Sequence, residues 1–275
     1  MKDEAVSGVP DEPIRENRFR LELRLLLTAV MFYTRIKCPD WVGYSAERLN
    51  RSTRYFPAMG WLVGLVVAAV MLATGLVLPT VVAVVLGLAA GVLLTGAFHE
   101  DGFADVCDGF GGGTSRQRTL DIMKDSRVGA FAAIGLVLLF SLKIAALTAL
   151  MDTGIWQAAA ALLFAHVLSR WCVVTIIFSD DYARDDLTSK VKPIGRKISR
   201  LGFAAASVWM LPFVGLSWWQ PWWLLAIPIA FLVRLALARW FRQRLGGYTG
   251  DCLGMAQQVN EVVTLLVVLA SINIS

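Results

Sequence analysis

Long apolar segments separated by short polar connections dominate the hydrophobic pattern of this chain. A helix needs about 20 mostly apolar residues to cross a bilayer. The segments that reach or approach this length are residues 57–78, 80–98, 130–151, 155–178, 201–219, 222–241 and 259–274. Membrane-spanning strands would instead alternate apolar and polar residues over about ten positions. The pattern therefore predicts an all-α polytopic membrane protein with about seven transmembrane helices.

The connections alternate between short links without Lys or Arg and longer basic loops. The short links are at residues 79, 152–154 and 220–221, and the basic connections are residues 37–54, 99–129, 179–200 and the stretch after 241. Lys and Arg concentrate in the cytoplasmic loops of membrane proteins. We therefore expect every sizeable loop to face the cytoplasm.

The N-terminal region differs from the rest of the chain. Residues 21–36 form a shorter apolar stretch that follows several Arg residues, so we expect a helix that lies in the cytoplasmic interface or re-enters the membrane. Residues 1–17 are polar and lack the apolar core of a signal peptide. We interpret them as a disordered tail, followed by a single integral membrane catalytic domain over residues 18–275.

Composition agrees with a membrane protein and excludes several classes of function. Hydrophobic residues make up 57% of the chain and charged residues 17%, and the mean hydropathy is +0.61; soluble domains are about 45–50% apolar. The net charge of +5 does not indicate nucleic-acid binding, because the basic residues flank apolar segments. The four cysteines form no CxxC pair and there are only two histidines, which excludes zinc knuckles and His-rich metal sites.

Four acidic residues gather directly after the second apolar segment. Asp101, Asp105 and Asp108 are spaced i, i+4 and i+7, which places three carboxylates on one face of a helix, and Glu100 lies beside them. A hard divalent cation would relieve their mutual repulsion, and Mg²⁺ prefers carboxylates together with substrate phosphates. We therefore predict metal binding by these four residues. The alternative is that they are solvated and cap helices.

Glycines and further charges follow the acidic cluster. Gly111 and Gly112 belong to a glycine run whose backbone N–H groups could approach phosphate oxygens. Downstream, Lys124 and Arg127 offer cations to phosphate beside the carboxylate of Asp125. Carboxylates, metal and cations together favour phosphoryl transfer. An ordinary amphipathic cytoplasmic helix is the alternative for residues 121–127.

Several charged residues fall inside the apolar segments, where charge costs about 2.5–3.5 kcal/mol. Lys143 is far from either end of its segment, and His166 and Arg170 share a helical face. For Arg170 and Arg234 the alternative is snorkelling to the interface.

A third acidic patch precedes and enters the last apolar segment. Asp251, Gln258 and Glu261 fall on one helical face at its cytoplasmic end, which favours a site shared with the acidic cluster. The alternative is a capped helix start, with Asp251 near the positive end of the helix dipole.

The motifs resemble those of the adenosylcobinamide-GDP ribazoletransferases, also called cobalamin (5′-phosphate) synthases. The resemblance runs from about residue 21 to the C-terminus, and the stretches that carry it are FYTR at 32–35, RYFP at 54–57, the acidic cluster, MKDSRVG at 123–129 and GYTGD at 247–251. Cys107 and Cys252 stand where we would expect other small residues.

The resemblance implies a prokaryotic inner-membrane enzyme that joins adenosylcobinamide-GDP to α-ribazole or its 5′-phosphate, releases GMP and needs Mg²⁺. It implies that Lys124 and Arg127 hold the diphosphate and that Asp125 or Asp251 is the general base. The other residues that we assign to substrate binding are Arg35, Arg54, Gly111, Gly112, Arg170 and Gln258. Homo-oligomerisation and association with other corrinoid-pathway enzymes stay open, and the lipid bilayer is the expected surroundings.

Two other functions deserve comparison. CDP-alcohol phosphotransferases carry an Asp-x-x-Asp-Gly motif like residues 105–109, but Gly112–Gly113 replaces the expected Ala-Arg, and Gln117 stands where their second motif has Gly. A transporter could use Lys143, His166 and Arg170 as a pathway, but transporters commonly show internal repeats, and none is visible. Both fit less well than the ribazoletransferases.

Overall fold

The computed structural model describes residues 17–183, 197–216, 218 and 220–272, and in this part the regular secondary structure is helical apart from one β-bridge between Tyr182 and Tyr248. The expected tail, residues 1–17, lies outside the described residues except for Asn17. The helices are α1 Arg18–Tyr33, α2 Ala46–Ser52, α3 Phe56–Gly75, α4 Thr80–Thr95, α5 Phe98–Gly112, α6 Arg116–Ile122, α7 Ala130–Thr153, α8 Ile155–Ser179, α9 Arg200–Val208, α10 Leu211–Leu216, α11 Ala226–Leu245 and α12 Gly250–Ile272. Short 3₁₀ turns are η1 Asp40–Val42, η2 Thr53–Tyr55 and η3 Pro221–Leu225.

The described helices that are long and apolar enough to cross a membrane number five, not about seven. They are Ala46–Gly75, Ala130–Thr153, Ile155–Ser179, Pro221–Leu245 and Gly250–Ile272, and a sixth span results if the bent pair α4–α5 counts as one. The expectation of about seven spans is therefore wrong in number, while the all-helical polytopic architecture is confirmed.

The predicted span 201–219 is interrupted. It divides into α9 and α10, because Pro212 in the first turn of α10 has no backbone N–H to donate to the preceding turn. Neither piece alone is long enough to cross a bilayer.

The predicted span 80–98 ends early, at a sharp bend. Helix α4 stops at Thr95, and the chain turns by 91° into α5. Gly96 and Ala97 both have positive φ at this point, +69° and +59°. Glycine adopts this conformation without penalty, whereas alanine pays roughly 1–2 kcal/mol for it. The bend turns the acidic helix α5 away from the axis of α4.

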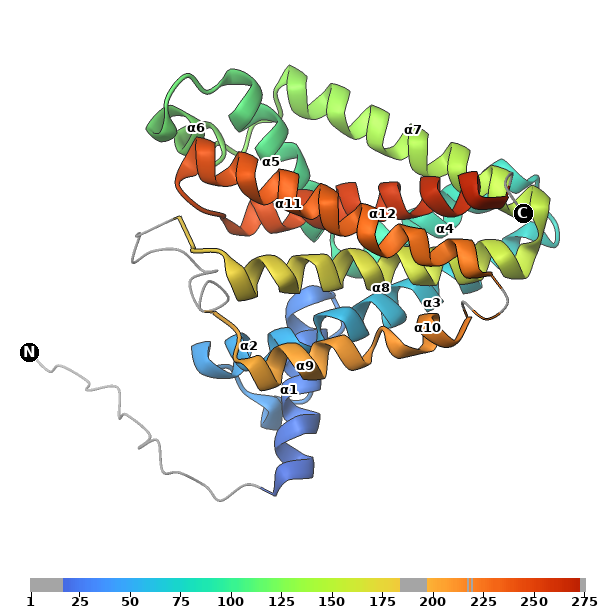
Figure 1. The fold of residues 1–275 in the computed structure, drawn as a ribbon, viewed down its shortest axis with the longest axis horizontal. Coiled ribbons are helices and arrows are strands. Elements are labelled where there is room, and N and C mark those ends of the chain that lie inside the picture. The colour runs from blue at the N-terminus through green and yellow to red at the C-terminus, as the bar shows by residue number, and fades with distance from the viewer. Residues whose placement is uncertain (1–16, 184–196, 217, 219, 273–275) are drawn as a thin grey trace, which may run out of the picture.

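Helices α8 and α12 form the centre of the molecule. Of the most apolar part of each helix, 83% of α8 and 72% of α12 is buried, against 28% of α7 and of α11. Helix α12 packs on α5 and α8, and α3 packs on α4 and α8. Figure 1 shows these long helices running side by side, with α1 standing across them. Helix α1 is not among the candidate spans, and its interfacial or re-entrant placement stays a prediction.

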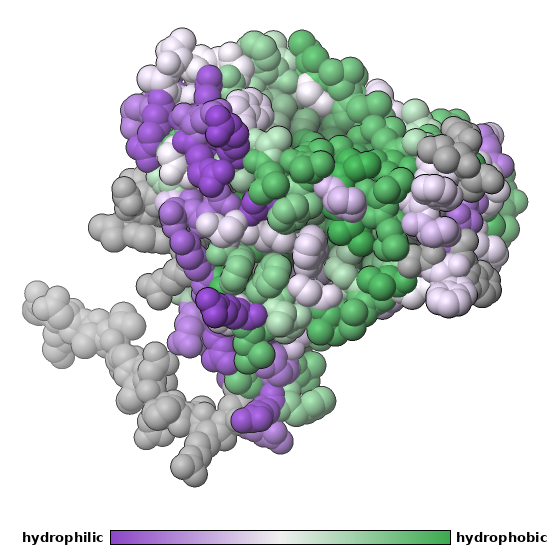
Figure 2. Space-filling model, viewed as in Figure 1, coloured by the Kyte–Doolittle hydropathy of each residue, from purple (hydrophilic) through white to green (hydrophobic). Residues whose placement is uncertain are grey.

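Hydrophilic residues gather at one end of the visible face. In Figure 2 they cover the end that carries α6 and the turn between α11 and α12, while the bodies of the long helices are hydrophobic. The acidic helix α5 leads into this polar end (Figure 1).

Candidate active site

Helix α5 displays the four acidic residues as the sequence predicts. Residues 98–112 form one continuous helix, so Asp101, Asp105 and Asp108 lie along one of its faces. Asp101 is exposed, and Glu100, Asp105 and Asp108 are half-buried. The carboxylate face therefore begins immediately after the bend at Gly96 and Ala97.

The start of α12 crosses α5 at a point where both helices have glycine. A β-carbon placed on Gly102 would lie 2.9 Å from Cα of Asp251, and one on Gly254 would lie 2.9 Å from the carbonyl oxygen of His99. Small residues let two helix backbones approach this closely. The crossing brings Asp251 to the acidic helix, although the two lie far apart in the sequence.

Asp108 links the acidic helix to the turn that precedes α7. Its Oδ2 accepts a hydrogen bond from the Gly129 N–H at 2.6 Å, and its Oδ1 accepts one from the Ala132 N–H at 2.9 Å. These are first-turn N–H groups that have no partner within α7 itself. Asp108 thus caps α7, as the alternative interpretation of the acidic cluster proposed for this residue.

Asp125 and Arg127 pair with each other in that turn. The Arg127 Nη2 lies 2.6 Å from Asp125 Oδ2, and the Arg127 backbone N–H also donates to Asp125 Oδ1 at 3.1 Å. The hydrogen bonds from the Arg127 side chain lower the pKa of Asp125 to about 2. A carboxylate with so low a pKa is a weak base. Lys124, beside this pair, is exposed.

The glycine run lies in a helix and not in an open turn. Gly111 and Gly112 form the last turn of α5, and Gly113 caps it. Gly111 lies against the ring of Phe131, where a β-carbon would come within 2.5 Å of the ring, and Gly113 lies against Thr119. The glycines therefore permit close packing onto α6 and α7. Their substrate-binding role stays a prediction.

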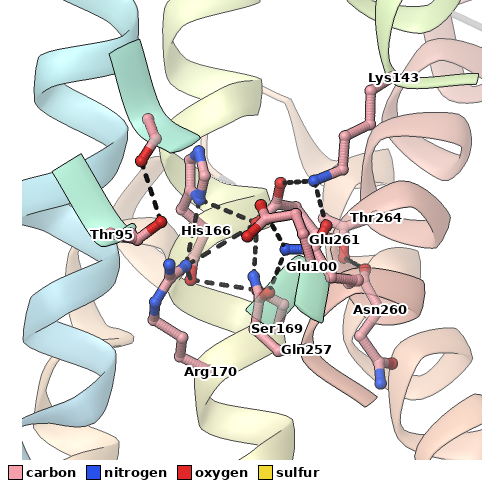
Figure 3. A network of polar contacts seen from close by, with 12 residues as sticks. Thr95, Glu100, Lys143, His166, Ser169, Arg170, Gln257, Asn260, Glu261 and Thr264 are labelled. Carbon is pink, nitrogen blue, oxygen red and sulfur yellow. Dashed lines mark hydrogen bonds and ion pairs between the residues drawn. The ribbon is translucent and has the colours of Figure 1, made fainter. Parts of the chain in front are cut away.

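A network of buried charges lies between α7, α8 and α12. Lys143 Nζ is 2.6 Å from Glu261 Oε1, and His166 Nδ1 is 2.9 Å from Glu261 Oε2. Arg170 Nη1 lies 3.8 Å from the same oxygen. Figure 3 shows these three side chains pointing towards Glu261. Each of the four is at most 5% exposed. A buried charge needs a partner of opposite charge. Lys143, which is too far from either end of its helix to reach the membrane interface, pairs with Glu261.

The network extends to the acidic helix through Gln258. Its Oε1 accepts a hydrogen bond from Lys143 at 2.6 Å, and its Nε2 donates to Glu100 Oε1 at 3.0 Å. The other oxygen, Glu100 Oε2, is buried and has no hydrogen-bond partner among the described residues. Glu100 thus faces the buried network (Figure 3). Arg170 and Gln258, predicted as substrate-binding residues, belong to this network.

Arg35 and Arg54 take different places. The Arg35 guanidinium lies against Gly96 at the α4–α5 bend, and its backbone N–H donates to Leu94 O at 2.8 Å. Arg54 pairs with Glu22 of α1 at 3.1 Å. Arg35 is therefore beside the start of the acidic helix, and Arg54 joins η2 to α1.

A second buried ion pair was not predicted as a pair. Arg234 Nη2 lies 2.9 Å from Asp180 Oδ2 and donates to Thr175 O at 2.7 Å. Arg242 approaches the other Asp180 oxygen at 3.2 Å. Arg234 stood out in the sequence because it interrupts an apolar segment, but no periodicity connects it to Asp180. The pair joins α11 to the end of α8.

The acidic residues fit a metal only in part. Within the described residues, no three His, Cys, Asp or Glu side chains are placed to hold a metal ion together. Glu100 and Asp108 have the partners given above. Mg²⁺, however, commonly uses one or two carboxylates and completes its shell with water and substrate phosphates. The donor set therefore suits a metal that binds together with a phosphate substrate.

These features define a polytopic helical membrane enzyme whose acidic helix meets the start of its last span. The chain belongs to the cobalamin-5-phosphate synthase family, whose model matches residues 25–269. It is 45% identical over 255 residues to an adenosylcobinamide-GDP ribazoletransferase of Leptothrix cholodnii, covering 91% of this chain and 97% of the relative. It is 44% identical to the enzyme of that name from Shewanella amazonensis, covering 91% and 96%. No solved structure matches. The chain is therefore a transferase of cobalamin biosynthesis, as its motifs predicted.

Proposed function

We propose that this protein transfers the adenosylcobinamide phosphate group of adenosylcobinamide-GDP to a ribose hydroxyl of α-ribazole or α-ribazole 5′-phosphate. The hydroxyl oxygen forms a bond to the cobinamide-side phosphorus of the diphosphate, and the bond from that phosphorus to the bridging oxygen breaks. GMP leaves, and adenosylcobalamin or its 5′-phosphate forms. Family membership supports the overall reaction.

The observation that carries the site is the close crossing of α5 and α12. It brings Asp251, a candidate base, to the helix that carries the carboxylates. Positioning of reacting groups supplies much of the catalysis in phosphoryl transfer, because the protein does little covalent chemistry there.

Asp101 and Asp105, one turn apart on α5, are the residues that would hold Mg²⁺ together with the substrate diphosphate. When bound, the metal would neutralise negative charge that develops on the leaving phosphate. We assign Asp108 to fixing the turn before α7. We assign Glu100 to joining α5 to the buried network.

Asp251 is the better candidate for the general base. Asp125 has its pKa lowered to about 2 by Arg127, so it accepts a proton poorly near neutral pH. Lys124 and Arg127 are exposed in the turn before α7. From there they would contact the diphosphate oxygens of the substrate. Arg35, at the bend, offers a further cation near the start of α5.

The active site would face the cytoplasm. Basic loops mark the cytoplasmic side, and the hydrophilic end of the molecule in Figure 2 carries α6 and the turn before α12. Water-soluble substrates would reach Asp251 and the acidic helix from this side.

The test is GMP release by the purified full chain in detergent with adenosylcobinamide-GDP, α-ribazole and Mg²⁺. Release that EDTA abolishes, and that Asp105→Ala reduces without unfolding the protein, supports the reaction and the metal site together. A folded wild-type protein that releases no GMP contradicts the proposal. CDP-alcohol substrates would then be the next to assay, since the acidic motif resembles that of their enzymes.

A further inference from the structure

Arg116 connects α6 to the turn between α11 and α12. It is the first residue of α6, which packs against α11 at the polar end of the molecule (Figure 1). Its Nε donates a hydrogen bond to Leu245 O at 2.8 Å, and its Nη2 donates one to Ala183 O at 2.6 Å. Both nitrogens belong to one guanidinium, whose N–H groups have a fixed geometry. One side chain of α6 therefore joins the end of α11 to the segment that follows α8.

The two carbonyl groups that accept from Arg116 belong to buried residues. Leu245 is fully buried and Ala183 is 8% exposed. Leu245 is also the last residue of α11, so its carbonyl is one of those that have no partner within the helix. A hydrogen bond from a charged donor is stronger than one from a neutral donor, and a buried carbonyl that loses its donor costs free energy. We therefore expect Arg116 to stabilise this turn.

Arg244 makes a reciprocal connection from α11 to the acidic helix. It lies in the last turn of α11, and its Nη2 donates to Phe110 O at 2.9 Å and to Gly113 O at 2.7 Å. Its guanidinium also lies over the Phe110 ring, 5.4 Å from the centroid. A cation is favourable at the carbonyl end of a helix, as here at the end of α5. The end of α5 and the end of α11 are thus joined by two arginines, Arg116 and Arg244, which we call the arginine clasp.

The turn that the clasp fixes leads directly to Asp251. Tyr248 donates its N–H to Asp181 O at 3.0 Å and accepts a hydrogen bond from the Ala183 N–H at 2.8 Å. The Asp181 carbonyl also leaves no room for a β-carbon at Gly247. Helix α12 begins two residues after Tyr248, and Asp251 lies in its first turn. Because a helix is rigid, a displacement of this turn moves Asp251.

We propose that Arg116 and Arg244 are positioning residues for the transfer reaction, which fix the turn before α12 so that Asp251 keeps its place beside the carboxylates of α5. The inference rests on the proposed function for the role of Asp251 as the base. Both arginines act through backbone carbonyls, and displacement of a reacting group by about 1 Å can cost about 100-fold in rate. Neither stood out in the sequence, because both lie in basic connections, where Arg is common.

The first test measures hydrogen exchange of the full chain in nanodiscs without substrate. Arg116→Met should speed exchange in the peptide that contains Tyr248 about tenfold or more, because it removes two hydrogen bonds from a charged donor. Arg116→Lys, which keeps the charge and a donor, should show a smaller increase. Arg118→Met is the matched control, since it removes the same charge from the same helix, and should leave this peptide unchanged. Unchanged exchange in folded Arg116→Met and Arg244→Met overturns the proposal.

The second test is a double-mutant cycle on GMP release. Arg116→Met should lower kcat about 10- to 100-fold and leave the KM for adenosylcobinamide-GDP within about twofold. In the Asp251→Asn background the same change should cost less than about twofold, because its effect on the rate passes through Asp251. An equal loss in both backgrounds overturns the proposal. A raised KM with an unchanged kcat also overturns it, since Arg116 would then contact the substrate.

The two tests separate this inference from the proposed reaction. A wild type that releases no GMP refutes the reaction, and faster exchange at Tyr248 in Arg116→Met then still shows that the clasp fixes the start of α12. Normal GMP release with unchanged exchange supports the reaction and overturns the clasp. If Arg116→Met does not fold, Arg244→Met and Arg116→Lys replace it in both tests, and the same outcomes decide.

Discussion

Gly102 and Asp251 lie in backbone contact although about 150 residues separate them: a single added β-carbon at Gly102 would approach Cα of Asp251 to 2.9 Å. The contact sets the distance between the acidic helix and the candidate base. Because α5 and α12 are rigid helices, a displacement at this contact moves Asp251 relative to all the carboxylates of α5.

Replacing Gly102 by Ala should therefore impair catalysis more than folding. The new methyl group pushes α12 away from α5, and a displacement of about 1 Å at a reacting centre can cost about 100-fold in rate. We expect a loss of that order in the kcat of GMP release. Gly215→Ala is the matched control, since a β-carbon there meets nothing within 4 Å. Full activity in Gly102→Ala would show that the crossing does not position the base.

The buried network should respond to the removal of a single charge. Lys143→Met leaves Glu261 without its closest cation in a dry environment, and we expect a loss of about 3–5 kcal/mol in unfolding free energy. Lys143→Met combined with Glu261→Gln should recover about 1–3 kcal/mol of this, because the second change removes the carboxylate that lost its closest cation, while Glu100 remains as a carboxylate near Arg170. Denaturant titrations in mixed micelles measure both.

An exposed pair supplies the control for that experiment. Arg51 and Glu47 lie 3.7 Å apart with side chains 39% and 79% exposed. Arg51→Met should change stability by less than about 1 kcal/mol. If Lys143→Met combined with Glu261→Gln is as unstable as Lys143→Met alone, packing and not charge balance determines the loss of unfolding free energy.

The acidic residues should separate into metal-binding and structural classes. Asp101→Asn should raise the Mg²⁺ concentration needed for half-maximal activity without lowering the melting temperature, because Asp101 is exposed. Asp108→Ala should lower the melting temperature without changing the magnesium dependence, since it removes the cap of α7 and costs about 0.5–2 kcal/mol of unfolding free energy. Magnesium titrations and thermal melts of both variants check this. A shared shift in magnesium dependence would place Asp108 on the metal.

The pH dependence of the reaction should not report Asp125. Its pKa is lowered to about 2, so it stays ionised from pH 4 upwards. In the unfolded chain the pKa of an Asp is about 3.9. Any stability that the pairing of Asp125 with Arg127 contributes is therefore present above about pH 3.9 and is lost only as the pH falls towards 2. The acid limb of kcat/KM between pH 5 and 8 should therefore be the same in Asp125→Asn as in the wild type. Asp251→Asn should lower kcat about 10²- to 10⁴-fold. If the acid limb disappears in Asp125→Asn, Asp125 and not Asp251 is the general base.

The sequence by itself determined the helical membrane class, the carboxylate face of α5 and the family, because each rests on local spacing or on short motifs. Residues 98–112 have only to be helical for Asp101, Asp105 and Asp108 to align. Apolar length likewise locates α7 and α8 without knowledge of their neighbours.

Only the tertiary structure decided what each polar residue contacts. Lys143 meets Gln258 across 115 positions of sequence, and Gln258 in turn binds Glu100 across 158. Arg54 pairs with α1, and Asp108 caps α7. The physical reason is that a buried charge needs a partner from whichever helix packs against it, and helix packing depends on surfaces that no local pattern specifies. The glycine contacts between α5 and α12, which bring Asp251 to the acidic helix, likewise depend on helix packing.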